Sequence, residues 1–161
     1  MGLDTYFYRT NKSNVGKDFD PFKTSCVEVA YFRKFWGLLN FFPGYQGCEY
    51  IEVSRETIDS LCNLAKKLIK MLEKTLTDNG WIIEHSPLCK DSNGDWYHNF
   101  ELENGLFTES LEEMTDNVCY EVFDCGDAFI TYKVISLYQS FKDILDNTNW
   151  DTDSILMESD W

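Results

Sequence analysis

Histidine and cysteine side chains offer the most versatile chemistry in this chain, and histidines are few. His85 and His98 are the only two, so any acid–base or metal scheme that uses imidazole depends on them. Together with the nearby Cys89, they have the donor atoms of three zinc ligands. The sequence offers no obvious fourth ligand and no recognised zinc spacing, so we expect a partly exposed His85 and a sheet-packed His98 in place of a metal site.

Other catalytic motifs are also missing from the sequence. Residues 91–95, DSNGD, resemble part of a calcium loop, but an EF-hand needs glycine at its sixth position and glutamate at its twelfth. Their Asn93-Gly94 step instead predicts the turn of a β-hairpin. The adjacent Glu112 and Glu113 would point about 100° apart on a helix and could not act as an acid–base pair. We therefore expect a protein that is not an enzyme and that has no cofactor and no metal.

Charge is the most informative property of the sequence. The chain of 161 residues has a formal net charge of −14. Residues 1–80 hold 11 Lys/Arg against 10 Asp/Glu, and residues 81–161 hold 3 against 18, so the excess lies in the second half. Phosphate binding needs clustered Lys and Arg. We therefore expect no direct binding of nucleic acid, and we expect a basic protein as the partner.

The sequence shows no targeting signal. Residues 1–9, MGLDTYFYR, have no basic region followed by an apolar stretch. No run approaches the roughly 18 apolar residues of a membrane span. The six cysteines include no Cys-x-x-Cys pair, and they are expected to be free thiols in a reducing cytosol. We expect a cytoplasmic protein without contact to a membrane.

Apolar residues at helical spacing predict three main helices, at 28–42, 55–76 and 129–145. The first is expected to be the central core helix, because one stripe of it holds four large apolar residues: Phe32, Phe35, Trp36 and Leu39. The polar face of the second is expected to face water, and it carries a row of lysines: Lys66, Lys67, Lys70 and Lys74.

Alternating residues predict short strands at 3–9, 49–53, 81–84 and 118–123 and in a hairpin at 91–103. A short acidic helix is expected to begin near Thr108. This order has no repeating βαβ unit. We therefore expect a single α+β domain, in which a mixed or antiparallel sheet of short strands packs against the three main helices.

The domain is expected to span residues 1–145 and to be followed by an acidic-aromatic tail. Residues 146–161, DNTNWDTDSILMESDW, mix acidic and apolar side chains. Two interpretations of this tail stay open. It is either an interaction segment or a tail whose apolar residues pack on the domain's own surface.

Three stretches resemble a family of small proteins of bacteriophages and bacteria that has no assigned activity. They are MGLDTYFYR at 1–9, EVAYFRKFWGLLNFF at 28–42 and CEYIEVSRETIDSLCNLAKKLIKML at 48–72. The family opens with a Met-Gly-Leu-Asp-x-Tyr strand, continues with a Glu-Val-x-Tyr-Trp-Arg-Lys helix and then starts a helix with Tyr-x-Val-Ser-Arg-Glu. Its central helix tends to carry an Asn and a His, where this chain has Trp36 and Leu39. The resemblance covers less than half of the chain and implies a phage origin, and hence the cytoplasm of the host cell.

Charge and resemblance together favour an inhibitor of a basic host protein that binds nucleic acid. A CRISPR effector or another defence nuclease is such a partner, and an acidic surface would associate with it quickly and in a salt-dependent way. The residues expected to bind the partner are eight acids and two tryptophans: Glu101, Glu103, Glu109, Glu112, Glu113, Asp116, Glu121, Asp124, Trp150 and Trp161. This hypothesis requires the carboxylates to share one face of the protein.

Three alternatives stay open. Scattered acids would serve only solubility. An interaction module would dock through exposed aromatics with little dependence on salt: Trp96, Tyr97, Trp150 and Trp161. A metal-dependent or acid–base enzyme would use His85, His98 and nearby acids.

Overall fold

The computed structural model describes residues 2–16, 18–47, 49–80, 88, 92–93, 109–127 and 129–160, with the backbone alone for residues 109–115. The predicted strand at 81–84 and nearly all of the predicted hairpin at 91–103 lie outside these residues. So do the side chains proposed as zinc ligands: His85, Cys89 and His98.

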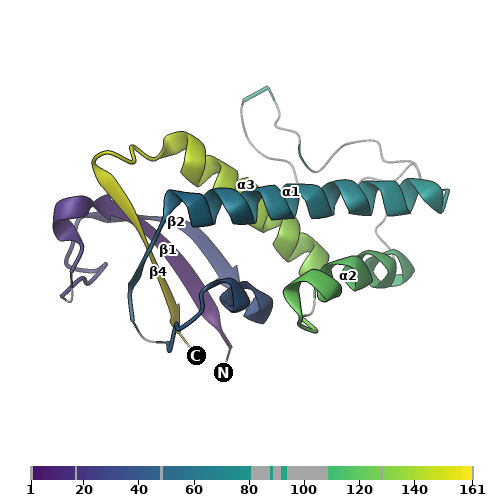
Figure 1. The fold of residues 1–161 in the computed structure, drawn as a ribbon, viewed down its shortest axis with the longest axis horizontal. Coiled ribbons are helices and arrows are strands. Elements are labelled where there is room, and N and C mark those ends of the chain that lie inside the picture. Colours follow the sequence, from purple (N-terminus) through teal and green to yellow (C-terminus); the bar gives the residue numbers. More distant parts are fainter. Residues whose placement is uncertain are drawn as a thin grey trace. The chain divides into compact units, whose positions relative to one another are not determined.

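The fold is α+β, as the sequence predicts: one antiparallel sheet of four strands and three main helices (Figure 1). The strands are β1 (Asp4–Asn11), β2 (Cys26–Arg33), β3 (Ile51–Val53) and β4 (Asp153–Asp160). Their order in the sheet is β2-β1-β4-β3. The helices are α1 (Arg55–Asp78), α2 (Glu109–Phe123) and α3 (Ile130–Asn147). None of the described helices is long and apolar enough to cross a membrane.

Two of the three predicted main helices are confirmed. The helix expected at 55–76 is α1, and Ser54 caps it, because the Ser54 Oγ accepts a hydrogen bond from the Thr57 backbone N at 3.2 Å. Gly80, with φ of 83°, follows its end and adopts the left-handed conformation common there. The helix expected at 129–145 is α3.

The predicted central helix at 28–42 is wrong. Its first part belongs to strand β2, in which Ala30 and Phe32 are buried and Tyr31 is exposed. Lys34, with φ of 53°, ends the strand, and a short 3-10 helix follows at Trp36–Phe41. Large aromatic and β-branched residues occur in strands as readily as in buried helices. Because this run is almost continuously apolar, its pattern does not distinguish the helical period of 3.6 residues from the strand period of 2.

The predicted strand at 118–123 is also wrong, because α2 starts where the acidic helix was expected and continues through Phe123. Asp124, with φ of 48°, then ends the helix, and its backbone N donates to the Tyr120 carbonyl oxygen at 2.9 Å. The alternation that predicted the strand spans only six residues, too few to outweigh a helix that is already under way.

The expected tail is in fact part of the sheet. Residues Asp153–Asp160 form β4, an interior strand that pairs with β1 on one side and with β3 on the other. Acidic residues at both ends of the strand obscured its apolar centre at Ile155, Leu156 and Met157, which is buried. Neither interpretation of a C-terminal tail therefore describes these residues.

The chain divides into two compact units. The sheet unit comprises Met1–Leu61 and Ser140–Trp161, and the helical unit comprises Cys62–Gln139. The core of the sheet unit is aromatic: the Phe7 ring lies 5.1 Å from that of Phe141 and 6.0 Å from that of Phe32, both edge to face. The four described cysteines are free thiols: Cys26, Cys62, Cys119 and Cys125.

Replacement of Phe7 by alanine should lower the free energy of unfolding by about 3–5 kcal/mol, because the side chain is fully buried and its loss leaves a cavity among aromatic rings. Phe22 belongs to the same unit and is 95% exposed, so its replacement by alanine should change that free energy by less than about 0.5 kcal/mol. Urea unfolding of both variants measures the two effects. A small loss at Phe7 would contradict the aromatic core.

Candidate functional site

The ten residues expected to bind a partner fall into three groups in the structure. Three lie outside the described residues: Glu101, Glu103 and Trp161. Three lie on α2 where the backbone alone is described: Glu109, Glu112 and Glu113. Four have described side chains: Asp116, Glu121, Asp124 and Trp150.

Asp116 is buried, with 6% of its surface exposed. Its Oδ1 accepts hydrogen bonds from the Thr131 backbone N at 3.1 Å and from the Thr131 Oγ1 at 2.6 Å. Thr131 lies in the first turn of α3, where backbone N–H groups lack partners within the helix. The Asp116 carboxylate therefore stabilises the helical unit from inside and is not presented to a partner, contrary to the prediction.

Replacement of Asp116 by alanine should lower the free energy of unfolding by about 1–3 kcal/mol, because the buried Thr131 groups lose this acceptor. Glu121 also lies on α2 but is exposed, so Glu121→Ala should change the value by less than about 0.5 kcal/mol. Urea unfolding compares the two variants. Equal effects would contradict the structural role of Asp116.

Glu121 and Asp124 are exposed at the C-terminal end of α2. They are the two members of the predicted acidic surface whose side chains are seen to face solvent. A single acidic face along α2 stays a prediction.

Trp150 is half-buried and lines a cavity of about 280 Å³ at the start of α1. Its carbonyl oxygen accepts a hydrogen bond from the Lys12 Nζ at 2.6 Å. Its indole Nε1 is buried and has no hydrogen-bond partner within the described part of the chain. The charged residues that line the cavity are of both signs: Lys12, Glu52, Arg55, Glu56 and Asp153. Such a mixed lining gives no marked preference for a basic partner.

The lysine row of α1 is exposed, as predicted: Lys66, Lys67, Lys70 and Lys74. Lys74 forms an ion pair with Asp78, one turn along the helix. The row lines an open groove of about 450 Å³ on the surface of the helical unit. Exposed charges opposite an apolar stripe are the ordinary solvated face of an amphipathic helix.

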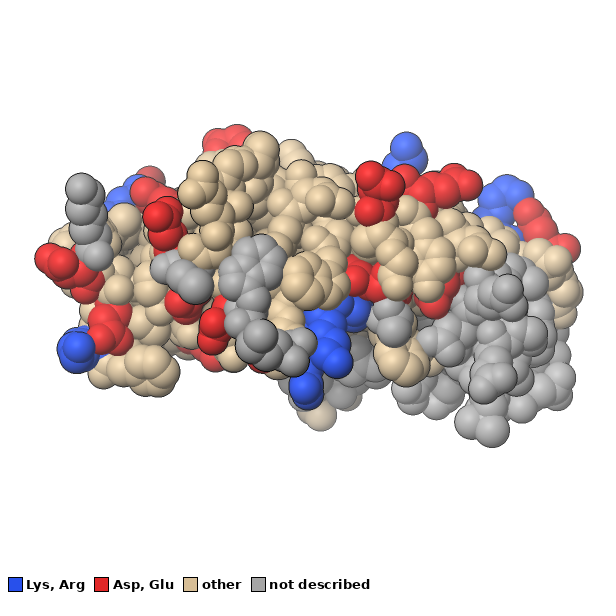
Figure 2. Space-filling view, turned by 90° about the horizontal axis from the view of Figure 1, so that it is seen from below, with Lys and Arg blue, Asp and Glu red and all other residues tan. Residues whose placement is uncertain are grey.

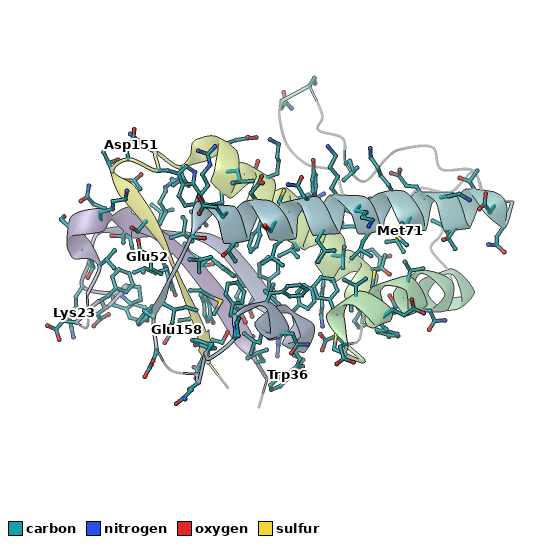
Figure 3. All side chains as sticks on the ribbon, viewed as in Figure 1. Lys23, Trp36, Glu52, Met71, Asp151 and Glu158 are labelled. Carbon is teal, nitrogen blue, oxygen red and sulfur yellow. The ribbon has the colours of Figure 1, made fainter. Side chains whose placement is uncertain are left out.

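The structure brings a different set of acids together, on the face of the sheet opposite to Phe7. Side chains that lie directly across from each other in antiparallel strands point to the same face. Tyr6 of β1 lies across from Glu158 of β4, and Asp4 lies across from Asp160. Figure 3 labels Glu158 on β4. On the other side, Tyr8 lies across from Glu28 of β2. This surface comprises eight residues, and we call it the acidic tyrosine face: Asp4, Tyr6, Tyr8, Glu28, Tyr31, Tyr50, Glu158 and Asp160.

Aromatic rings form a continuous row on this face. The Tyr6 ring lies 5.1 Å from the Tyr31 ring and stacks 6.1 Å from the Tyr8 ring. The Tyr8 ring lies 6.2 Å from the Tyr50 ring, and Tyr50 packs edge to face on Phe19 at 4.9 Å. The rings hold one another in place, so the face is a preformed surface.

The four carboxylates of the face form no ion pair within the described part of the chain. Asp4 accepts a hydrogen bond from the Tyr31 hydroxyl at 2.9 Å, and it lies directly across from the like charge of Asp160. Like charges in such positions destabilise a sheet.

One feature moderates this excess of negative charge. Arg33 of β2 lies across the sheet from Asp4, although the two form no ion pair. Red Asp and Glu surface is nevertheless more extensive than blue Lys and Arg surface in the view of Figure 2. A cationic partner would relieve the repulsion on the acidic tyrosine face.

The phenols of the face have raised pKa values. Burial, followed by the charges of Glu28 and Glu158, raises the pKa of Tyr8 to about 12. Burial raises the pKa of Tyr50 as well, and so does the hydrogen bond from its hydroxyl to Glu158. Burial and then four carboxylates raise the pKa of Tyr6: Asp4, Glu28, Asp160 and Glu158. The negative charges of all four acids therefore oppose ionisation of the Tyr6 phenol.

A cavity of about 460 Å³ opens on the face, and six residues of the face line it together with Pro21, Phe22 and Cys26. The turn that carries Phe22 is ordered, because Asp20 Oδ1 accepts from the Phe22 backbone N at 2.9 Å and Lys23 pairs with Asp20. The Phe22 ring is almost fully exposed beside the cavity. Burial raises the pKa of the Cys26 thiol, which therefore stays protonated at neutral pH. The described residues include no group of three or more side chains suited to a metal ion.

Only one of the three strands that carry the acidic tyrosine face was predicted from the sequence. The alternation of Asp4, Tyr6 and Tyr8 with Thr5 and Phe7 was visible, and β1 is confirmed. Glu158 and Asp160 were assigned to a tail, and Glu28 was assigned to a helix. The pairing of β1 with β2 and β4 brings them together, and neither β2 nor β4 was predicted.

Comparisons of the chain with protein-family models, with curated proteins and with solved structures find no match. The resemblance to a phage and bacterial family therefore stays an expectation, and the candidate site rests on its own geometry.

Stability should fall with rising pH partly because of Tyr8. The folded protein releases the Tyr8 proton near pH 12, whereas the unfolded chain releases it near pH 10. Ionisation therefore favours the unfolded chain, and the contribution of Tyr8, fully present below about pH 10, is lost as the pH rises through about 12.

Tyr8→Phe should flatten this fall, since phenylalanine has no proton to lose. Urea unfolding of both proteins at a series of pH values between about 9 and 12 gives the comparison. Parallel curves for the two proteins would show that the Tyr8 phenol is not perturbed.

Proposed function

We propose that this protein binds a basic segment of another protein through the acidic tyrosine face. The observation that carries the proposal is the convergence of four carboxylates around the row of tyrosines: Asp4, Glu28, Glu158 and Asp160. None of the four forms an ion pair with a Lys or Arg among the described residues. Complementary charge steers association and selects the partner, and aromatic side chains supply most of the binding energy at many interfaces.

The partner that best matches this chemistry is a protein whose basic groove binds nucleic acid. A host defence nuclease such as a CRISPR effector has such a groove, and the net charge of −14 supports long-range attraction to it. By occupying the groove, the protein would act as an inhibitor that competes with DNA or RNA. The expected phage origin is consistent with this role and rests on the sequence resemblance alone.

This proposal moves the interface from the second half of the chain to the sheet. Asp116 is excluded by its burial, and the exposed Glu121 and Asp124 remain a rival surface on α2. Docking through aromatics alone is the second candidate, and the exposed Phe22 ring beside the cavity favours it. The two candidates differ in the expected effect of salt.

A pull-down with four forms of the full-length protein tests the proposal. They are the wild type, the double variant Glu28→Gln/Glu158→Gln, the double variant Glu121→Gln/Asp124→Asn on α2 and the control Asp151→Asn, which removes an exposed carboxylate outside the face. We expect the wild type and the control to capture a nucleic-acid-binding protein at low salt, because the carboxylates are then poorly screened. High salt or added DNA or RNA should release it, and Glu28→Gln/Glu158→Gln should not capture it.

Two other outcomes would overturn parts of this account. A partner that survives high salt and binds Glu28→Gln/Glu158→Gln as well as the wild type would assign the interface to the aromatic side chains. A partner that is lost in Glu121→Gln/Asp124→Asn and retained in Glu28→Gln/Glu158→Gln would assign it to α2.

A further inference from the structure

The cavity of the acidic tyrosine face is large enough to admit a side chain of a partner. Its volume of about 460 Å³ falls within the range of small-ligand sites. Three tyrosine rings and three carboxylates line it: Tyr6, Tyr8, Tyr50, Glu28, Glu158 and Asp160. All of them belong to the sheet unit. An apolar wall with anionic acceptors around it suits a ligand that is flat, cationic and rich in donors.

We infer that this cavity binds an arginine side chain of the basic partner. The inference rests on the proposed function and specifies the chemistry of its central contact. A guanidinium is planar, stacks on aromatic rings and has five N–H donors, so it can lie against tyrosine and bond to more than one carboxylate. A lysine ammonium is a compact charge without a flat surface and matches only the carboxylates.

The positions of the rings and acids support this preference. The Tyr6 and Tyr8 rings are nearly parallel, with 17° between their planes, and the Tyr50 ring is inclined by 59° to that of Tyr8. Glu158 lies close enough to the Tyr50 hydroxyl to raise the pKa of that phenol. Glu28 lies across from Tyr8 on the opposite side of β1. An arginine over Tyr8 would therefore have acceptors on both sides.

Phe22 adds a contact for the backbone or a neighbouring side chain of the partner. Its ring is 95% exposed although the turn that carries it is hydrogen-bonded. Pro21, next to it, also lines the cavity. An exposed aromatic ring on an ordered turn beside a charged cavity is typical of the anchors found in protein interfaces.

Titration of the full-length protein with capped glycine peptides tests the inference, with amide NMR shifts as the readout of affinity. The peptides carry at their centre arginine, lysine or citrulline, the neutral isostere of arginine. We expect the arginine peptide to bind roughly three- to tenfold more tightly than the lysine peptide. The citrulline peptide should bind about tenfold or more weakly than the arginine peptide.

Variants then locate the site. Tyr8→Leu and Glu158→Gln should each weaken arginine binding several-fold, whereas Asp151→Asn, which lies outside the face, should retain it. Tyr8→Phe keeps the ring and should bind arginine more tightly than Tyr8→Leu does. Undisturbed amide shifts within the sheet unit, away from the substituted residue, identify variants that still fold. Retained binding in Tyr8→Leu would overturn the inference, because the ring would then play no part.

The outcomes separate this inference from the proposed function. Equal affinities for arginine and lysine would overturn the arginine site and leave a basic partner in place. If no peptide binds but the pull-down still captures a basic protein through Glu28 and Glu158, only the arginine site is overturned. If no peptide binds and the pull-down captures no such protein, the arginine site and the proposed function are both overturned.

Discussion

The antiparallel pairing of β1 with β4 is the interaction on which the rest of the sheet unit depends. It joins residues near the two ends of the chain, with Asp4 across from Asp160 and Asn11 across from Asp153. The Thr5 and Ser159 hydroxyls form a buried hydrogen bond of 2.8 Å between the strands. A shift of this register by one residue would exchange the two faces of β4. The same register therefore determines both the aromatic core and the composition of the opposite face.

That register places like charges together, and in the described part of the chain none of these carboxylates forms an ion pair. Asp4 and Asp160 face each other, and Glu28 and Glu158 lie on either side of the tyrosine row. Arg33 of β2 lies across from Asp4, and its charge acts on the Tyr31 phenol. Sequences that fold well usually avoid such conflicts except at functional sites. The proposal of a cationic partner at the acidic tyrosine face rests on this conflict.

The sequence predicted an element correctly where its apolar residues followed one periodicity, either that of a helix or that of a strand. The long helices α1 and α3 were clear, since apolar and polar residues alternate there at helical spacing over many turns. Residues 26–33 were misassigned because large aromatic residues fit a buried helix and a strand equally well. β4 was missed because its short apolar centre lies between acids. The acidic tyrosine face could not be found from sequence, since its carboxylates come from strands that pairing alone brings together.

The most direct test of the account is the binding of a fluorescent arginine-rich peptide, measured by anisotropy with two charge-matched double variants. Glu28→Gln/Glu158→Gln removes two charges from the acidic tyrosine face, and Glu121→Gln/Asp124→Asn removes two from the end of α2. The account predicts a large loss of affinity in the first variant and nearly unchanged affinity in the second. Equal losses would show that the peptide responds only to net charge, and a loss confined to the second variant would place the interface on α2.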